Sequence, residues 1–303
     1  MNAMAEVRLF PTARYSQIET KFDPEHRILW GFMNPRPRPT FNPTLLEEAR
    51  EFGRWIAMNN ARIWHDGVQC QISYVVEASR VPGVFNLGGD LALFRQAIHS
   101  HDRQLLIDYG TKCIDNVYGW ATGFGQPVTT ISLVQGDAMG GGLESALSAT
   151  TLVAEESSRM GFPEILFNLF PGMGAYSLLS RKVGRRTAEE LITSGKLYSA
   201  RQLFDLGVVD VLAPDGTGEA TVYSYIKKHA RSENGRRAIE SVRRAVDPLD
   251  YEELARVVGI WADAALQLSE RDLKMMERLV RAQDRNSSLE VAPTNVTPLS
   301  RMA

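Results

Sequence analysis

The stretch SLVQGDAMGGGLESAL, residues 132–147, decides how we interpret this chain. Residues 128–135 have the pattern of a buried β-strand, and the glycine triplet Gly140 to Gly142 leads into helix-forming residues. Glycine lets the backbone turn sharply and lets a ligand approach its amide groups closely. The amides at a helix start are unpaired and favour negative charge. One such turn is more often a simple connection, so it is only a candidate site.

A second stretch of the same design lies earlier in the chain. VFNLGGDL, residues 84–91, is again an apolar run followed by glycines and a helix start. Two such turns together favour an oxyanion hole, because that site needs two donors converging on one oxygen. Phosphate binding is the competing interpretation, but GxxxxGK[ST] is absent and the glycine spacing does not give GxGxxG after a first strand. Nucleotide binding by these routes is therefore not expected.

Two carboxylates accompany these turns. Glu144 lies in the first turn of an otherwise apolar helix, where it could simply complement the helix dipole. Glu164 lies in the apolar run GFPEILFNLF of a loop-rich segment, residues 161–177. It is either a buried catalytic group or a solvated side chain on a loop. Apolar surroundings raise the pKa of a carboxyl, which suits a group that must take and give protons.

Composition and charge exclude several classes of protein. Hydrophobic residues make up 44% and charged residues 23%, as in globular proteins, and the net charge of −2 provides no global attraction to nucleic acid or membrane. Cys70 and Cys113 lie far apart, so neither a disulfide framework nor a metal site is expected. His99 and His101 fall in a polar stretch typical of a helix junction. Without a signal core or a membrane-spanning apolar run, we expect a cytoplasmic protein.

The order of elements predicts an α/β fold. Polar and apolar residues around Asp23 indicate two initial strands, and Asn42 is predicted to cap a helix over 43–58. Strands then alternate with helices until about residue 215. We therefore expect a catalytic core over 1–215 and a region of about three helices over 216–285. The polar tail, residues 286–303, is expected to be disordered.

Together these segments resemble the crotonase, or enoyl-CoA hydratase/isomerase, superfamily. VFNLGGDL resembles its first oxyanion segment, and residues 126–147 resemble the second. Residues 161–184 resemble the segment that carries the second acid, and residues 188–212 resemble the family's next segment in order. The similarity spans roughly residues 75–214 and rests on the motifs occurring in this order. It implies a spiral of ββα units with a helical C-terminal region that packs in trimers.

Within the superfamily the chain is most similar to the RpfF-type synthases of the diffusible signal factor, through FNLGGDLALF, LVQGDAMGGGLE, FPGMGAYS and MERLVRAQ. Those enzymes dehydrate 3-hydroxyacyl-acyl-carrier-protein to the cis-2-enoyl thioester and hydrolyse thioesters, which releases a fatty acid used in quorum sensing. On matched positions, Glu144 and Glu164 would be the catalytic pair, and Gly89 and Gly141 the amide donors. The resemblance also implies a homotrimer or dimer of trimers and no cofactor, since phosphopantetheine of the carrier protein or of CoA holds the acyl group.

An apolar wall comes after the second acid. Many hydratases have a smaller, more polar stretch at this place, whereas this chain has large apolar residues. We interpret four of them, together with one tryptophan of the C-terminal helices, as an acyl pocket: Phe167, Leu169, Phe170, Met173 and Trp261. The apolar stripe around Trp261 is otherwise typical of helix packing.

Several alternatives stay open. The chain could be an ordinary enoyl-CoA hydratase or isomerase, or a crotonase-fold binding protein that regulates a sensor kinase. Ser177 and Ser180 lack the context of a hydrolase nucleophile. Acyl carrier protein is acidic, and three basic pairs could bind it, although a solvated helix face is the commoner explanation of any one pair. These pairs are Arg185 with Arg186, Arg236 with Arg237, and Arg243 with Arg244. The roles of the two glutamates and the acyl chain length also stay open.

Overall fold

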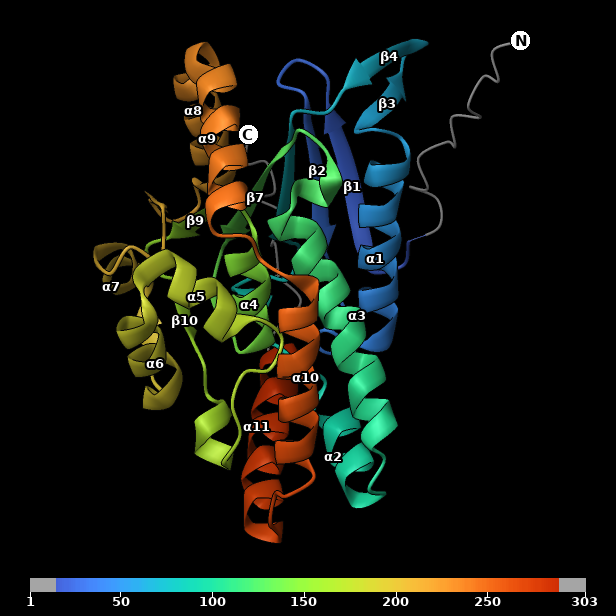
Figure 1. Ribbon diagram of the computed structural model, residues 1–303, viewed down its shortest axis with the longest axis vertical. Helices are drawn as coiled ribbons and strands as arrows, with labels where there is room; N and C mark the ends of the chain where they lie inside the picture. The colour runs from blue at the N-terminus through green and yellow to red at the C-terminus, as the bar shows by residue number, and fades with distance from the viewer. Residues whose placement is uncertain (1–14, 289–303) are drawn as a thin grey trace, which may run out of the picture.

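The computed structural model describes residues 15–288, with β-sheets at the centre and helices around them (Figure 1). The large sheet has the strand order β1-β2-β5-β7-β9-β12, the small sheet β11-β10-β8-β6, and β3 and β4 form a hairpin. The strands are β1 (Ile18–Asp23), β2 (Ile28–Met33), β3 (Arg62–His65), β4 (Val68–Gln71), β5 (Tyr74–Ser79), β6 (Val84–Asn86), β7 (Thr129–Val134), β8 (Asp137–Met139), β9 (Thr151–Glu155), β10 (Arg159–Gly161), β11 (Leu197–Ser199) and β12 (Val211–Ala213).

The described residues also form α-helices and three short 3₁₀ helices, several of which follow one another directly along the chain. The α-helices are α1 (Pro43–Met58), α2 (Leu91–His99), α3 (Arg103–Ala121), α4 (Gly141–Ser148), α5 (Ala175–Val183), α6 (Arg185–Ser194), α7 (Ala200–Asp205), α8 (Gly218–His229), α9 (Glu233–Val246), α10 (Tyr251–Ala265) and α11 (Glu270–Ser288). The 3₁₀ helices are η1 (Gly123–Gly125), η2 (Glu164–Phe167) and η3 (Ala230–Ser232).

The chain spirals between the two sheets. A strand of the large sheet is followed by a strand of the small sheet and then by helical residues, first in β5, β6 and α2, then in β7, β8 and α4. From β2 to β12 the neighbouring strands of the large sheet are parallel. Parallel strands covered on both faces are apolar throughout, and all six residues of β7 are buried. The predicted α/β spiral of ββα units is thereby confirmed.

Local signals account for the first elements. β1 and β2 pair antiparallel on either side of the predicted break. Helix α1 begins at Pro43, and the Asn42 side chain accepts a hydrogen bond of 3.0 Å from the backbone N–H of Leu45. An asparagine cap followed by proline satisfies one amide and removes another that would have no partner. Both predictions are confirmed.

Other expectations about the elements were wrong. The short strands β8, β10 and β11 were not predicted, because three residues carry no readable period. Helix α5 begins inside the segment expected to be irregular, directly after Gly174, whose φ is +126°. The C-terminal region contains four α-helices, α8 to α11, instead of about three. Helix α11 also continues into the expected tail, of which residues 289–303 lie outside the described residues.

The last two helices return to the centre of the chain. Helix α10 packs against α3, and α11 packs against α2, so the C-terminal region lies beside elements that follow the first glycine turn (Figure 1). One large apolar core joins these helices to α4 and α5. Trp261 of α10 is thereby placed near residues more than 150 positions earlier, such as Phe94 at 5.0 Å between ring centroids. Within residues 15–288, no helix has the length and apolar character needed to cross a bilayer.

Candidate active site

The two glycine turns predicted from the sequence lie against each other. Gly88 has a φ of +92°, and a Cβ atom placed on it would lie 2.6 Å from the carbonyl oxygen of Met139 and 3.0 Å from the amide nitrogen of Gly141. Only glycine permits both the backbone conformation and this approach. The parallel pairing of β6 with β8 brings the two turns to the same edge of the small sheet.

Two amides at this contact have no protein acceptor. The N–H of Gly88 donates to Asn86 Oδ1 at 2.8 Å, and that of Gly140 donates to the carbonyl of Gly161 at 2.9 Å. Among the described residues 15–288, the N–H groups of Gly89 and Gly141 make no hydrogen bond. Gly141 is the first residue of α4, where such amides are unpaired in any helix. Both glycines line one cavity, so their amides are available to a ligand oxygen.

Glu144 is held by backbone amides. It lies in the first turn of α4 with 2% of its surface exposed. Its Oε1 accepts hydrogen bonds from the N–H groups of Met173 at 2.8 Å and Ala175 at 3.0 Å. Burial raises the pKa of Glu144 to about 7, although these two hydrogen bonds favour the charged form. The carboxyl is therefore fixed in direction and titrates near neutral pH.

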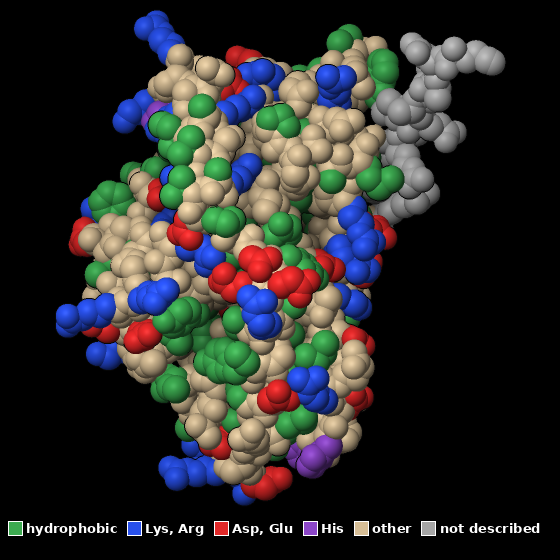
Figure 2. Space-filling model, in the orientation of Figure 1, with side chains coloured by type: hydrophobic (Ala, Val, Ile, Leu, Met, Phe, Trp, Pro, Cys, Tyr) green, Lys and Arg blue, Asp and Glu red, His purple; other side chains and the backbone are tan. Residues whose placement is uncertain are grey.

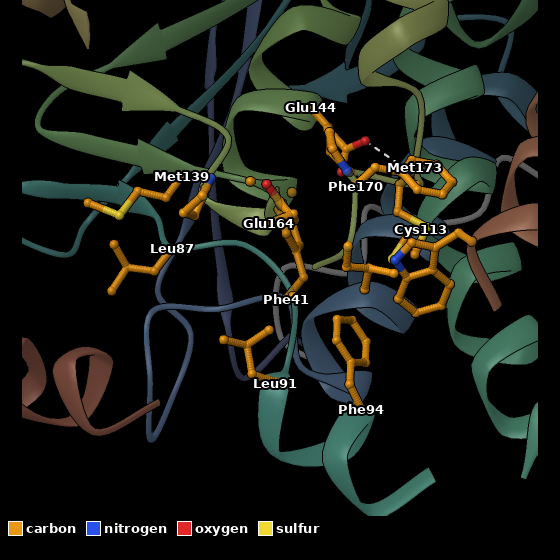
Figure 3. A pocket seen from close by; sticks show the side chains of 18 of the residues that line it. Phe41, Leu87, Leu91, Phe94, Cys113, Met139, Glu144, Glu164, Phe170 and Met173 are labelled. Carbon is orange, nitrogen blue, oxygen red and sulfur yellow. Dashed lines mark hydrogen bonds between the residues drawn. The ribbon is translucent and has the colours of Figure 1, made fainter. Parts of the chain in front are cut away.

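Glu164 faces the same cavity without such support (Figure 3). It begins the 3₁₀ helix η2, and its buried Oε2 has no hydrogen-bond partner within the described residues. Its pKa is raised to about 8, chiefly by burial and secondarily by the nearby charge of Glu144, while a hydrogen bond from its own backbone amide opposes both effects. A Cβ atom on Gly140, whose φ is +51°, would collide with Glu164 Oε1. The glycine triplet thus has two roles: Gly140 leaves room for the Glu164 carboxyl, and Gly141 provides an amide donor.

The residues that bear the two carboxyls and the free amides line one apolar cavity of about 330 Å³. All five residues predicted for an acyl pocket line it: Phe167, Leu169, Phe170, Met173 and Trp261. A Cβ atom on Gly172 would collide with the ring of Trp261, so this wall is closely packed. Leu166 and Leu197 also line the cavity, and they are 53% and 39% exposed, which indicates that it opens to solvent beside them.

Sequence reasoning missed much of the cavity wall, including one residue before α1 and two on α3. Phe41 lies in the segment between β2 and α1, which is rich in Pro and Arg, and donates its N–H to the carbonyl of Gly88 at 2.8 Å. Tyr109 and Cys113 are one turn apart on α3 and both line the cavity. Burial raises the pKa of the Cys113 thiol, so the thiol stays neutral. The period of α3 indicates a buried face, but it cannot distinguish core from cavity wall.

A third buried carboxyl lies behind the site. Glu77 of β5 accepts hydrogen bonds from Ser132 Oγ at 2.6 Å and from Ser145 Oγ at 3.1 Å. Burial raises its pKa to about 7, against the effect of both hydroxyls. Ser145 lines the cavity but Glu77 does not. Glu77 therefore connects α4 to the large sheet by hydrogen bonds. It resembles the carboxyls of Glu144 and Glu164 only in its raised pKa.

Other candidates stay apart from the cavity. His99 ends α2, and His101 lies in the turn before α3, as expected of a helix junction. One member of each of two basic pairs is already engaged, since Arg186 pairs with Glu190 and Arg237 with Glu233. Within the part of the chain that the structure describes, no group of three His, Cys, Asp or Glu residues could hold a metal ion.

The chain belongs to the enoyl-CoA hydratase/isomerase family, because residues 64–282 match that family's model. It is 31% identical over 150 residues to a probable enoyl-CoA hydratase of Bacillus subtilis, covering 48% of this chain and 56% of that protein. It is 29% identical over 229 residues to the mitochondrial probable enoyl-CoA hydratase 2 of Arabidopsis thaliana, covering 74% and 68%. The chain thus spans little more than half the length of the Bacillus relative.

Solved structures share the fold. An enoyl-CoA hydratase from Bacillus halodurans matches with a TM-score of 0.71 and 19% identity, over 87% of this chain and 100% of that one. DspI of Pseudomonas aeruginosa matches with a TM-score of 0.64 and 21% identity, over 89% and 96%. Enzymes of this family need no cofactor and act on acyl groups carried by CoA thioesters.

Proposed function

We propose that this chain dehydrates a 3-hydroxyacyl thioester of acyl carrier protein to the cis-2-enoyl thioester and then hydrolyses the thioester, as a cytoplasmic source of a fatty-acid signal. One observation carries the catalytic part: Glu144 and Glu164, both with raised pKa values, face a cavity that also holds the free amides of Gly89 and Gly141. The signal type and the carrier rest on the resemblance of the glycine and acid motifs to RpfF-type synthases.

The amides would hold the thioester carbonyl. Hydrogen bonds from Gly89 and Gly141 stabilise the enolate-like charge that develops when an α-proton leaves, and losing one such donor costs about 3–4 kcal/mol of barrier in other enzymes. We assign α-proton removal to Glu164, because its carboxyl lies against Gly140, the neighbour of the Gly141 donor. The α-carbon is bonded directly to the held carbonyl, so this contact would bring the Glu164 carboxyl close to the α-proton.

Glu144 would then complete the elimination. Its Oε1 is occupied by two amides, which leaves Oε2 to contact the 3-hydroxyl. Proton transfer from Glu144 releases that hydroxyl as water while the electrons of the α-carbon form the 2,3 double bond. For hydrolysis, one glutamate takes a proton from a water that attacks the carbonyl carbon, and the same two amides hold the tetrahedral oxyanion. The carrier thiol then leaves with a proton, and free acid remains.

The cavity suits an acyl chain, since its walls are apolar along Phe170, Met173 and Trp261. The exposed side chains of Leu166 and Leu197 would lie beside the arm that carries the thioester.

Lys196 is exposed between the cavity-lining residues Gly195 and Leu197, and it is the basic residue we expect to contact an acidic carrier. Lys196→Glu should raise the KM for carrier-protein substrates more at low salt than at high salt. An unchanged KM would remove Lys196 from carrier binding.

Self-association would use a helix whose apolar side faces outward. Helix α9 exposes Ile239, Val242 and Val246, and hydrophobic side chains run along it in Figure 2. Its Glu240 instead faces the chain's own sheet and accepts a hydrogen bond of 2.9 Å from Thr129 Oγ1. We propose that further copies cover this face in a trimer or a dimer of trimers. Val242→Glu should shift sedimentation toward smaller species, whereas an unchanged mass would exclude this face.

A sensor kinase is a further proposed partner, tested by co-purification.

The deciding experiment supplies 3-hydroxydodecanoyl-acyl-carrier-protein and identifies the products by mass spectrometry against cis and trans standards. The proposal predicts free cis-2-enoic acid, absent with Glu144→Ala. A trans-enoyl product that stays on its thioester would instead support an ordinary enoyl-CoA hydratase, the function that the Bacillus and Arabidopsis relatives favour. No product from carrier-protein or CoA thioesters would contradict both enzymatic interpretations and favour a binding protein.

A further inference from the structure

A buried tyrosine connects the two chain segments that meet at Gly89. Tyr109 of α3 is 4% exposed. Its hydroxyl donates to the carbonyl oxygen of Phe41 at 2.6 Å and accepts from the backbone N–H of Asp90 at 3.2 Å. Phe41 forms an isolated parallel bridge with Gly89, and Asp90 directly follows Gly89. One hydroxyl therefore makes hydrogen bonds with the residue that follows Gly89 and with the residue that pairs with it.

The rings below the turn leave it no space to move inward. The ring of Phe94 packs edge-on against that of Tyr109, with centroids 4.9 Å apart. A Cβ atom on Gly89 would lie 2.6 Å from the Phe94 ring and 3.6 Å from the Tyr109 hydroxyl. The backbone of Gly89 thus rests directly on these two side chains. Trp261 also packs edge-on against Phe94, at 5.0 Å between centroids.

The tyrosine has the chemistry of a support and not of a proton carrier. Burial raises the pKa of Tyr109 well above its ordinary value, so the phenol stays neutral while it donates and accepts. In a regular parallel bridge the Asp90 N–H would donate to the Phe41 carbonyl. Here the Tyr109 hydroxyl lies between them, because it accepts from the Asp90 N–H and donates to the Phe41 carbonyl. The N–H of Gly89, one residue earlier, keeps no protein acceptor within residues 15–288.

We propose that Tyr109 is a positioning residue that aims the Gly89 amide at the thioester carbonyl. The inference rests on the proposed function, because it requires Gly89 to be one of the two donors. A donor that is aimed in advance contributes most where charge develops, in the transition state. Loss of the hydroxyl should therefore lower kcat and leave KM nearly unchanged.

The test uses Tyr109→Phe, with Tyr118→Phe on the same helix as the matched control. Tyr118 is half-buried, packs on Tyr251 and does not line the cavity. Turnover and KM are measured on a 3-hydroxyacyl thioester. The carbonyl stretching frequency of a bound ¹³C-labelled saturated acyl thioester is measured by difference infrared spectroscopy. We expect Tyr109→Phe to lower kcat at least tenfold, to change KM less than twofold, and to reduce the downward carbonyl shift seen with the unaltered protein. Tyr118→Phe should leave all three unchanged.

The outcomes separate this inference from the function on which it rests. An unaltered protein that does not lower the carbonyl frequency would overturn the proposed oxyanion site itself. A shift that persists in full in Tyr109→Phe, with or without lower thermal stability, would leave Tyr109 a purely structural residue and overturn the inference. If Tyr109→Phe does not fold, the test uses 3-fluorotyrosine at position 109. Its hydroxyl keeps both hydrogen bonds, and fluorine changes their strength. A changed carbonyl shift then supports the inference, and an unchanged one overturns it.

Discussion

The two carboxyls of the cavity differ in how the fold holds them. Glu144 lies on a two-turn α-helix, and two backbone amides fix its Oε1. Glu164 lies on the single turn η2, and its Oε2 is buried without a partner among the described residues. The pKa values are raised in both cases, to about 7 and about 8, chiefly by burial.

The difference teaches how one apolar cavity can supply two functions. A carboxyl tied by two amides keeps a constant direction, which suits contact with a group that must leave on one defined side. A carboxyl oxygen with no partner, such as Oε2 of Glu164, stays available to the substrate, at a cost in stability that folding alone would not favour. We therefore expect the two residues to respond alike in turnover but unlike in every other measurement.

The largest expected effect is on turnover of the proposed dehydration. Glu144→Gln and Glu164→Gln should each lower kcat by about 10²–10⁴-fold, the usual range for loss of a general acid or base. The comparison is sharpened by incubating a saturated acyl thioester in D₂O. Glu164→Gln should abolish α-proton exchange, whereas Glu144→Gln should retain it, because only Glu164 is assigned to the α-carbon.

Glu77→Gln provides the control for these substitutions. Glu77 is a buried carboxyl with a raised pKa that does not line the cavity, so its loss should change kcat by no more than a few-fold. Exchange that is lost with Glu144→Gln and kept with Glu164→Gln would reverse the two roles. A loss as large with Glu77→Gln would mean that carboxyl burial, and not position, determines the effect.

The next largest effect is an unequal response of the free energy of unfolding. Glu144→Ala leaves the amides of Met173 and Ala175 without an acceptor, which should destabilise the fold by about 1–3 kcal/mol at each. Glu164→Gln removes no hydrogen bond of Oε2 and should be close to neutral at pH 5. Unfolding by denaturant measures both. Equal losses would show that Glu164 is also held by the fold.

The same contrast depends on pH. A carboxyl whose folded pKa is raised binds its proton more tightly when folded, so its contribution is fully present below the unfolded pKa and is lost as pH rises. For Glu164 this loss runs from about pH 4.5 to about pH 8. Glu164→Gln should therefore be more stable than the unaltered protein at pH 9, at about 1.4 kcal/mol per unit of pKa shift. A stability difference that does not change with pH would contradict the burial of this carboxyl.

A smaller effect on turnover is expected at Gly140, which contacts the Glu164 carboxyl and precedes the Gly141 amide. Gly140→Ala places a methyl group against Glu164 Oε1 and forces alanine to a φ of +51°. We expect kcat to fall about tenfold, which corresponds to about 1.4 kcal/mol of barrier. Gly125→Ala is the control, because its φ of +68° imposes similar backbone strain with no atom within 4 Å. Equal activity losses in the two variants would attribute the effect to strain alone.

Glu144 and Glu164 could be predicted from the sequence because each stands in a short local motif, one after a glycine triplet and one in an apolar run. Tyr109 could not be recognised, since its hydroxyl binds a carbonyl 68 residues away and nothing local marks that contact. The spiral follows from alternating strand and helix patterns. Its three-residue strands, such as β8, form only because neighbouring chain segments pair with them.

The smallest expected effect is the electrical coupling between the two carboxyls. The charge of Glu144 is a secondary cause of the raised pKa of Glu164, after burial, so Glu144→Gln should lower that pKa by less than one unit. Glu164 has the higher pKa and is mostly protonated while Glu144 titrates, so Glu164→Gln should leave the pKa of Glu144 nearly unchanged. Carboxyl ¹³C resonances of labelled glutamate, titrated from pH 5 to pH 9, measure both values, with Glu77→Gln as the reference. A shift larger than one unit would make mutual repulsion the main cause, and the cavity would then hold one shared proton instead of two separately tuned groups.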